Sequence, residues 1–158
     1  MTTLTPRLRV AGPTDAETVG NLLDEFNIEF DTPTPGAEVF ALRFRRLLAL
    51  TEVFVLLAED SDAEPAGLAF LTLRPTPYFD GPLAQLEELY VRPALRNHGI
   101  GSALLTEAIE QLRARRCGEM HINVDEIDID TRRFYERHGF VNIEPGEDYR
   151  MLCYLREI

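Results

Sequence analysis

The sequence predicts an α/β protein in which helices pack on a single sheet of mixed strand direction. Apolar runs at 53–59, 66–74 and 86–91 have strand character and are bounded by turn-forming residues. Apolar residues also recur at helical intervals over about 15–28 and from 100 to 112. The elements expected along the chain follow the order β-α-α-β-β-β-α-β-α-β-β, which is typical of a mixed α/β sheet.

Length and composition are those of one globular domain, which we expect to span residues 1–158. With 158 residues, 45% of them hydrophobic, the chain is long enough for one core and short for two. The 16 basic residues, all of them arginine, and the 27 acidic residues give a formal net charge of −11. This charge disfavours nucleic acid and anionic membrane surfaces as partners and favours a cationic substrate.

The location that the sequence favours is the cytoplasm. The first residues, MTTLTPRLRV, lack the apolar core of a signal peptide. The longest apolar run, 53–58, is too short to span a bilayer. The cysteines, Cys117 and Cys153, can form only one pair, so we expect reduced thiols.

The N-terminal half is expected to contain an edge strand, two helices and a hairpin. Residues 8–11 form the strand, and the spacing of the residues at 14–17 predicts a capping box at the start of the first helix. The segment 31–36, with two prolines and a glycine, ends that helix. The two apolar runs that follow are joined by a polar turn and form the hairpin. The second helix carries one apolar face, formed by Phe40, Phe44, Leu47 and Leu48.

The C-terminal part is expected to add three strands and a short helix. Polar and apolar residues alternate over 120–125, so this strand is expected to turn its polar face toward a wet cleft. A helix over about 131–138 ends at Gly139. Strands at 140–143 and 151–155 flank a turn.

The junction between the strand at 86–91 and the following helix predicts an anion site. The first N–H groups of a helix lack intrahelical acceptors and lie at the positive end of the helix dipole, so they bind phosphate. Gly99 and Gly101 let the backbone approach such a group closely. Arg96 and His98 add cationic or hydrogen-bonding groups beside it.

Two common phosphate motifs do not fit this junction. A dinucleotide fingerprint requires a third glycine where the chain has Leu104, and a P-loop requires a lysine, which the sequence lacks. The hexapeptide at 96–101, RNHGIG, resembles instead the (Gln/Arg)-x-x-Gly-x-(Gly/Ala) motif of the GNAT superfamily of acyl-CoA N-acyltransferases. The preceding ELYVRP at 88–93 is similar to the strand and loop that enter this motif. The resemblance covers nearly the whole chain and implies the GNAT fold.

A second block of family character lies at 128–140, DIDTRRFYERHGF. It resembles the family's Asn-x-x-Ala-x-x-(Leu/Phe)-Tyr-x-x-x-Gly-Phe, with Asp128 and Thr131 in place of Asn and Ala. In the family, this tyrosine approaches the thioester sulfur and is proposed to protonate the departing thiolate. The resemblance implies that Tyr135 is the general acid, and a phenol with a pKa of about 10 can give its proton to a thiolate.

A carboxylate is expected to act as the base, because the attacking amine must be neutral and alkylamines are mostly protonated at neutral pH. Glu88 shares strand parity with Tyr90 and is the first candidate, while Glu87 and Asp125 are alternatives, acting directly or through water. Alternation lets only one of the two glutamates face the cleft unless a bulge intervenes. Some family members have Glu where Asn123 stands, which leaves the assignment of the base open.

The resemblance implies acetyl-CoA as cosubstrate and no metal. Family members hold the pantetheine arm by hydrogen bonds to the backbone of the central strand and the pyrophosphate on the loop and helix start. The predicted cofactor-binding residues are Leu89, Tyr90, Val91, Arg96, Asn97, His98, Gly99, Ile100, Gly101, Ser102 and Asp128.

The function implied is transfer of an acetyl group from acetyl-CoA to a primary amine by direct attack in a ternary complex. Two alternatives stay open: a non-catalytic acyl-CoA sensor or scaffold, and a protein acetyltransferase acting on N-termini or lysines. Many family members are dimers, so the analogy also suggests a homodimer. The expected acceptor is a small cationic molecule, such as a polyamine or aminoglycoside, beside acidic residues among Glu25, Glu29, Asp31, Asp80, Glu88 and Asp125.

Overall fold

The structure is a computed structural model that describes residues 5–158. The described chain divides into two compact units, one ending at His121 and the other spanning Ile122–Ile158. The mixed α/β class predicted from the sequence is confirmed. No helix of the described part is both long and apolar enough to cross a membrane.

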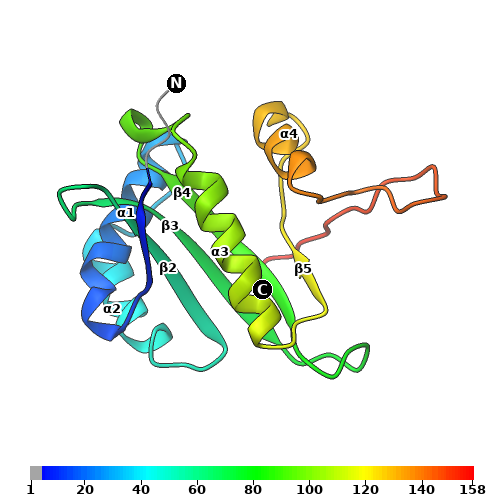
Figure 1. Cartoon of the computed structure of the whole chain (residues 1–158), viewed down its shortest axis with the longest axis horizontal. Coiled ribbons are helices and arrows are strands. Elements are labelled where there is room, and N and C mark those ends of the chain that lie inside the picture. Colours follow the sequence, from blue (N-terminus) through cyan, green and yellow to red (C-terminus); the bar gives the residue numbers. More distant parts are fainter. Residues whose placement is uncertain (1–4) are drawn as a thin grey trace. The chain divides into compact units, whose positions relative to one another are not determined.

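The first unit is built on a five-stranded sheet (Figure 1). Its strands are β1 (Arg7–Val10), β2 (Val53–Glu59), β3 (Pro65–Arg74), β4 (Leu83–Val91) and β5 (Glu119–His121). The strands lie in chain order across the sheet, and neighbours are antiparallel except β4 and β5, which are parallel. The predicted hairpin of β2 and β3 is confirmed.

Helices cover both faces of this sheet (Figure 1). On one face lie α1 (Ala16–Glu29) and α2 (Ala37–Leu47), and on the other lies α3 (Ile100–Ala114). Because strand residues alternate between faces, Leu57, Leu68 and Tyr90 join the core under α1 and α2. Phe54 belongs to the α3 side, where the Arg115 guanidinium lies 4.3 Å from the centre of its ring.

Two boundaries in this unit differ from those predicted. Strand β4 begins at Leu83 rather than Leu86. The strand predicted at 120–125 is wrong in length, since β5 ends at His121. Backbone pairing of β5 extends over three residues of β4 only, so the alternation beyond His121 has no ladder to support it.

The start of α1 also differs from the capping box predicted at 14–17. A 3-10 helix, Pro13–Asp15, precedes α1, and no side chain caps the first turn of either helix. The Asp15 carboxylate turns back instead, accepting the Gly12 N–H at 2.8 Å and pairing with Arg9. An arginine on the neighbouring strand therefore decides where this carboxylate lies, and local spacing does not reveal it.

The second unit contains α4 (Ile129–Arg137) and an extended tail. Helix α4 confirms the helix predicted at 131–138. Gly139 beyond it has a φ of +89°, the left-handed conformation in which a helix often ends.

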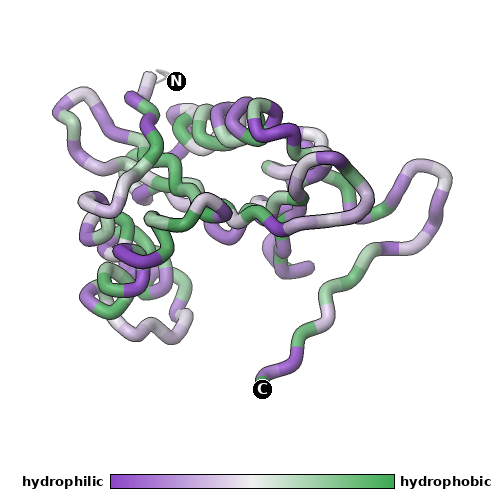
Figure 2. The backbone as a smooth tube through the Cα atoms, turned by 90° about the horizontal axis from the view of Figure 1, so that it is seen from below, coloured by the Kyte–Doolittle hydropathy of each residue, from purple (hydrophilic) through white to green (hydrophobic). Residues whose placement is uncertain are grey.

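The strands predicted at 140–143 and 151–155 are not formed in the structure. The Met151 N–H donates to the Asn142 carbonyl at 2.7 Å, but one such bond is not a ladder. The apolar side chains of the tail are exposed, and Figure 2 shows a hydrophobic stretch close to the C-terminus. Alternation of apolar residues predicts which face a strand would bury, but not that a neighbouring strand is present.

An ion-pair network ties β1 to β2 and to the turn before α1. The Arg9 guanidinium donates to Glu59 at 2.7 Å and grips both oxygens of Asp15 at 2.8 and 2.9 Å. Glu59 is only 8% exposed, so its charge depends on this arginine. The hydrogen bonds from Arg9 lower the pKa of Asp15 below its usual value.

Replacing Arg9 with glutamine should destabilise the protein by about 2 kcal/mol. The loss is smaller than for a fully buried pair because 35% of the Arg9 side chain is exposed. Since the folded pKa of Asp15 is lowered, its stabilising contribution is full above the unfolded pKa of about 3.9 and is lost as pH falls through the folded value. Urea unfolding should therefore show a smaller effect of R9Q in acid than at neutral pH.

The control for this measurement is Arg45→Gln, which removes an exposed ion pair with Glu17. This variant should change the free energy of unfolding by less than about 0.5 kcal/mol. Equal losses in R9Q and R45Q would contradict the role given to the network.

Candidate active site

Strand β4 carries a β-bulge at two consecutive glutamates. In the register between β3 and β4, Phe70 lies opposite Glu88 and Leu71 lies opposite Leu86. Glu87 is therefore the extra residue, and the alternation of side chains along β4 breaks at this point.

The bulge places both glutamates on the face of the sheet covered by α1 and α2. Glu88 shares its face with Phe70, whose ring contacts Phe44 of α2 with centroids 5.2 Å apart. Glu87 accepts a hydrogen bond from the hydroxyl of Thr72, which lies on the same face two residues beyond Phe70. This is the exception to strict alternation that the sequence analysis allowed.

Glu88 has the proton affinity that a general base needs near neutral pH. Its side chain is half-buried, and this burial, aided by the charge of Glu87, raises the pKa of Glu88 to about 7. A carboxyl group with a pKa near the working pH is a useful base because it is available in the charged form and still binds a proton well.

The second half of β4 has an open edge. Strand β5 pairs with 83–85, and no strand in the described chain lies beside the rest of that edge. The Arg92 N–H bonds the Ala66 carbonyl of β3 at 2.9 Å, and backbone groups alternate between the two edges of a strand. The backbone groups of Leu89 and Val91 therefore point to the open edge.

Tyr90, between them, anchors β4 to the core. Its side chain is 3% exposed and stacks on Phe26 of α1 with ring centroids 5.1 Å apart. Burial raises the pKa of the Tyr90 phenol, and the charges of Glu25 and Glu29 add to this effect. The phenol is thus held neutral within the core.

The loop after β4 prepares the start of α3 for an anion. Asn97 and Gly99 have φ angles of +63° and +87°, a left-handed conformation that these residue types tolerate. The Ala103 N–H bonds the Gly99 carbonyl at 2.9 Å as the first bond of the helix, so the N–H groups of 100–102 have no intrahelical acceptor. No side chain caps them, and the first turn contains no acidic residue.

Arg96 is engaged by protein groups. Its guanidinium grips both oxygens of Glu29, at 2.6 and 2.7 Å, and its Nε donates to the Val91 carbonyl at 2.9 Å. His98, the other basic residue of the predicted site, is half-buried in the same loop. The backbone amides, rather than the arginine, are thus the part of this loop best arranged to receive a phosphate.

In the second unit, Tyr135 is buried among aromatic rings. It is 5% exposed and makes edge-to-face contacts with Phe134 and Phe140, at centroid distances of 5.2 and 5.4 Å. Asp128 caps α4, accepting the Thr131 N–H at 3.2 Å. Asp and Asn are equally good in this position, so the departure of Asp128 from the family pattern keeps the cap.

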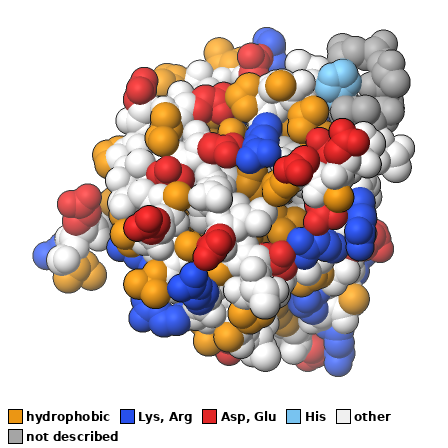
Figure 3. All heavy atoms as spheres, turned by 90° about the vertical axis from the view of Figure 1, so that its left-hand side faces the viewer, with side chains coloured by type: hydrophobic (Ala, Val, Ile, Leu, Met, Phe, Trp, Pro, Cys, Tyr) orange, Lys and Arg blue, Asp and Glu red, His pale blue; other side chains and the backbone are white. Residues whose placement is uncertain are grey.

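Three of the six acidic residues considered for the acceptor pocket are paired with arginines. Glu25 and Glu29 of α1 bind Arg92 and Arg96, and Asp80 lies 3.7 Å from Arg116. On the side of the molecule viewed in Figure 3, acidic and arginine side chains are interspersed.

The pairing of α1 with the loop was missed by the sequence analysis. A signal was present, because Glu25 and Glu29 are one helical turn apart and Arg92 and Arg96 have the same spacing. That spacing could have suggested two matching pairs, but not which helix meets the loop.

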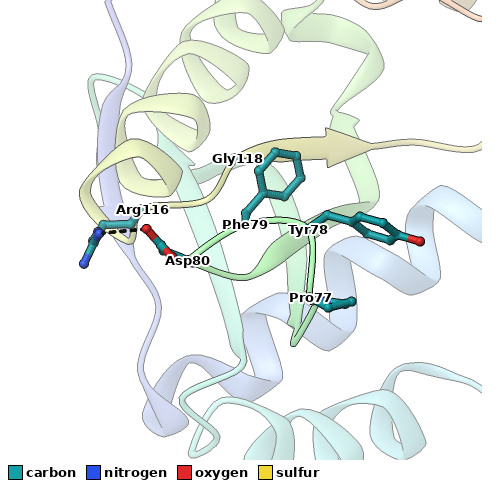
Figure 4. Close-up of a pocket in the computed structure, with 7 residues that line it drawn as sticks. Pro77, Tyr78, Phe79, Asp80, Arg116 and Gly118 are labelled. Atoms are coloured by element: carbon teal, nitrogen blue, oxygen red, sulfur yellow. Dashed lines mark ion pairs between the residues drawn. The ribbon is translucent and has the colours of Figure 1, made fainter.

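The loop at 75–82 lines a separate hollow at the start of β4 (Figure 4). Phe79 lies against Gly118, and Asp80 pairs with Arg116, while Tyr78 is 83% exposed. Because β4 is nine residues long, this hollow is about 25 Å from the end of β4 that enters the loop at 92–99, named the phosphate loop. The loop is therefore not part of the anion site.

The structure thus brings the predicted strand and loop residues of the first unit together around the end of β4 and the start of α3. Tyr135 and Asp128 belong to the second unit. In the described chain, no group of three or more His, Cys, Asp or Glu residues is arranged to hold a metal ion.

Two known proteins that are similar to this chain are named as N-acetyltransferases. Glucosamine 6-phosphate N-acetyltransferase 1 of Oryza sativa subsp. japonica is 29% identical over 120 residues, which cover 73% of this chain and 71% of that protein. Aminoglycoside N(6')-acetyltransferase type 1 of Klebsiella aerogenes is 40% identical over 67 residues, covering 41% of this chain and 44% of that protein.

Solved structures show the same fold. A crystal structure of a protein from Arthrobacter sp. FB24 named as an acetyltransferase is 47% identical, covers 100% of this chain and 98% of its own, and superposes with a TM-score of 0.88. An aminoglycoside acetyltransferase from an uncultured soil metagenomic sample covers 97% of this chain and 96% of its own with a TM-score of 0.79, but at 18% identity it shows the fold alone.

The sequence profile of the acetyltransferase (GNAT) family matches residues 18–140, which include β4, the phosphate loop and α4. The match extends over more than half of the chain and contains both blocks singled out from the sequence. The chain belongs to the acetyltransferase (GNAT) family.

Proposed function

We propose that this acetyl-CoA-dependent N-acetyltransferase acts on a primary amine of a small cationic molecule. The main support for the proposal is the state of Glu88. Its carboxyl group is half-buried, has a pKa of about 7 and lies on the strand that enters the phosphate loop. Two relatives are named for aminoglycosides and glucosamine 6-phosphate, which supports a small amine as acceptor.

The donor is proposed to bind along the open edge of β4. The backbone of Leu89 and the N–H of Val91 offer hydrogen bonds to the amide groups of the pantetheine arm, as a neighbouring strand would, while the Val91 carbonyl accepts from Arg96. The amide groups of 97–102 receive the pyrophosphate, and the dipole of α3 adds to the attraction. Binding in this way aligns the thioester beside the bulge of β4.

The proposed chemistry uses Glu88 as the base and Tyr135 as the acid. Glu88 takes a proton from the ammonium group, and the freed lone pair of nitrogen attacks the carbonyl carbon of the thioester. The tetrahedral intermediate then breaks its carbon–sulfur bond, and the thiolate takes a proton from the Tyr135 phenol. The nitrogen gives its second proton to the tyrosinate, which restores Tyr135, and Glu88 releases the proton that it took, so the products are an acetamide, free coenzyme A and one released proton.

The acceptor preference is proposed to follow from charge. The net charge of −11 attracts cations to the protein as a whole, and Glu88 with its neighbour Glu87 gives the bulge a local negative charge. Because Glu25 and Glu29 are neutralised by arginines, they contribute little to that preference.

A panel of amines tests the acceptor class. We expect thiol release from acetyl-CoA to be faster with sisomicin or spermidine than with glucosamine 6-phosphate, whose phosphate group is repelled by the acidic protein. The difference should shrink as salt is added. Thiol release with N-terminal peptides alone would indicate a protein acetyltransferase, and no release with any amine would contradict the proposal.

The pH dependence of kcat/KM tests Glu88 as the base. A carboxylate base must be ionised, so the rate should rise with pH through about 7 and then level off. Glu88→Gln should remove this limb and lower the rate on the plateau about 100-fold.

Glu87→Gln is the matched variant for that experiment. Removing the neighbouring charge lowers the pKa of Glu88, so the limb should move to lower pH while the plateau is retained. Loss of the limb in E87Q and its survival in E88Q would make Glu87 the base instead.

Tyr135→Phe tests the general acid. The substitution keeps the ring that packs between Phe134 and Phe140 and removes only the hydroxyl. We expect kcat to fall about 100-fold while the affinity for coenzyme A in calorimetry is unchanged. Tyr149→Phe, at an exposed tyrosine of the same unit, is the control. Full activity of Y135F would exclude the phenol as proton donor.

A further inference from the structure

The C-terminal end of α1 is joined to the phosphate loop by two arginine–carboxylate pairs of matching spacing. Glu25 binds Arg92, and Glu29, one turn later, binds Arg96. Both oxygens of each carboxylate accept a hydrogen bond from the paired arginine. Bidentate pairs fix the relative orientation of the two planar groups as well as their separation.

Arg96 links this helix to the open edge of β4. Two of its nitrogens bind Glu29, at 2.6 and 2.7 Å, and the third, Nε, donates to the Val91 carbonyl at 2.9 Å. Its guanidinium carbon lies 5.8 Å from the centre of the Tyr90 ring. The hydrogen bonds to Glu29 raise the pKa of Arg96, so the charge is permanent.

Arg92 makes a similar link through Glu25, one turn before Glu29 on α1. Its guanidinium donates to Glu25 at 2.8 and 3.0 Å and to the Pro65 carbonyl at 2.6 Å. Because Arg92 directly follows β4, it connects the end of this strand to α1 and to the start of β3.

Aromatic contacts accompany the two pairs. Phe26 of α1 stacks on Tyr90, and Phe30 meets Phe26 edge to face with centroids 5.2 Å apart. The last turns of α1 are thus fixed to the end of β4 by two ion pairs and by aromatic packing.

From these contacts we infer that Glu29 and Glu25 are positioning residues for the donor site. Glu29 holds Arg96, which donates to the Val91 carbonyl at the open edge of β4, and Glu25 holds Arg92, which donates to the Pro65 carbonyl of β3. Together the two pairs keep that edge and the loop amides in the geometry that binds acetyl-CoA. This inference rests on the proposed function. It assigns the two carboxylates to the donor side of the reaction, not to recognition of a cationic acceptor, and makes Arg96 a support of the loop, not a ligand of the pyrophosphate.

Glu29→Gln is the variant that tests the inference. Glutamine keeps the size of the side chain but cannot form the ion pair, so Arg96 loses its main partner. We expect the affinity for coenzyme A, measured by calorimetry, to fall about fivefold, as for loss of a partly exposed pair. The KM for acetyl-CoA should rise in parallel, while kcat, the acceptor KM and the pH limb of Glu88 stay unchanged.

Two further variants make the test specific. Arg96→Gln keeps a donor for the Val91 carbonyl and should weaken coenzyme A binding by about the same factor as E29Q. The double variant should be no worse than either single one, because both act through one pair. Glu17→Gln, which removes an exposed pair of the same helix with Arg45, should leave coenzyme A binding unchanged.

The outcomes separate the alternatives. If Arg96 bound the pyrophosphate directly, R96Q would weaken binding far more than E29Q, and E29Q would strengthen it by releasing the arginine. If Glu29 bound the acceptor, E29Q would raise the acceptor KM alone. Either result overturns the inference, as does unchanged coenzyme A binding in both variants of a protein that binds it normally. Failure of the unaltered protein to bind coenzyme A would overturn the proposed function as well.

Discussion

The site depends on the point at which β4 parts from β5. Over 83–85 the two strands form a parallel ladder. Beyond Gln85, β4 pairs with β3 along one edge, and its other edge has no partner strand in the described chain. A strand edge with unused backbone groups would invite pairing with any extended chain. Here a short loop joins the edge to the uncapped start of α3, so a long, extended ligand with phosphate at one end would satisfy both, as proposed for acetyl-CoA.

Charge around this edge is arranged by pairing rather than by accumulation. Four charged side chains of α1 and the loop cancel one another in two bidentate pairs, so the proposed anion site is formed by backbone amides. A rigid amide cradle suits a diphosphate because its donors are already oriented, whereas a flexible arginine would lose conformational freedom on binding. Glu87 and Glu88, which have no arginine partner in the described structure, lie at the bulge.

The sequence could predict whatever depends on local pattern. Periodicity located α1, α2, α3 and the hairpin, and the motif at 96–101 located the uncapped start of α3, because glycine positions and helix starts are local features. The bulge at Glu87 could not be predicted, since it is a property of the register between β3 and β4. The strands at 140–143 and 151–155 were predicted wrongly because apolar alternation says nothing about whether a neighbour is in place.

Glu88 and Asp15 show how the same fold uses carboxyl groups in opposite ways. Asp15 has a lowered pKa, so the folded state favours its charge and gains stability as pH rises through the acid range. Glu88 has a pKa of about 7, well above the usual 4.5, so the folded state opposes its charge, and stability falls as pH rises through this interval. The cost at neutral pH, at most about 3 kcal/mol, is larger than surface substitutions usually bring. A carboxyl kept in such a position against the stability of the fold is better explained by chemistry than by structure, because a glutamine there would keep the shape without the charge.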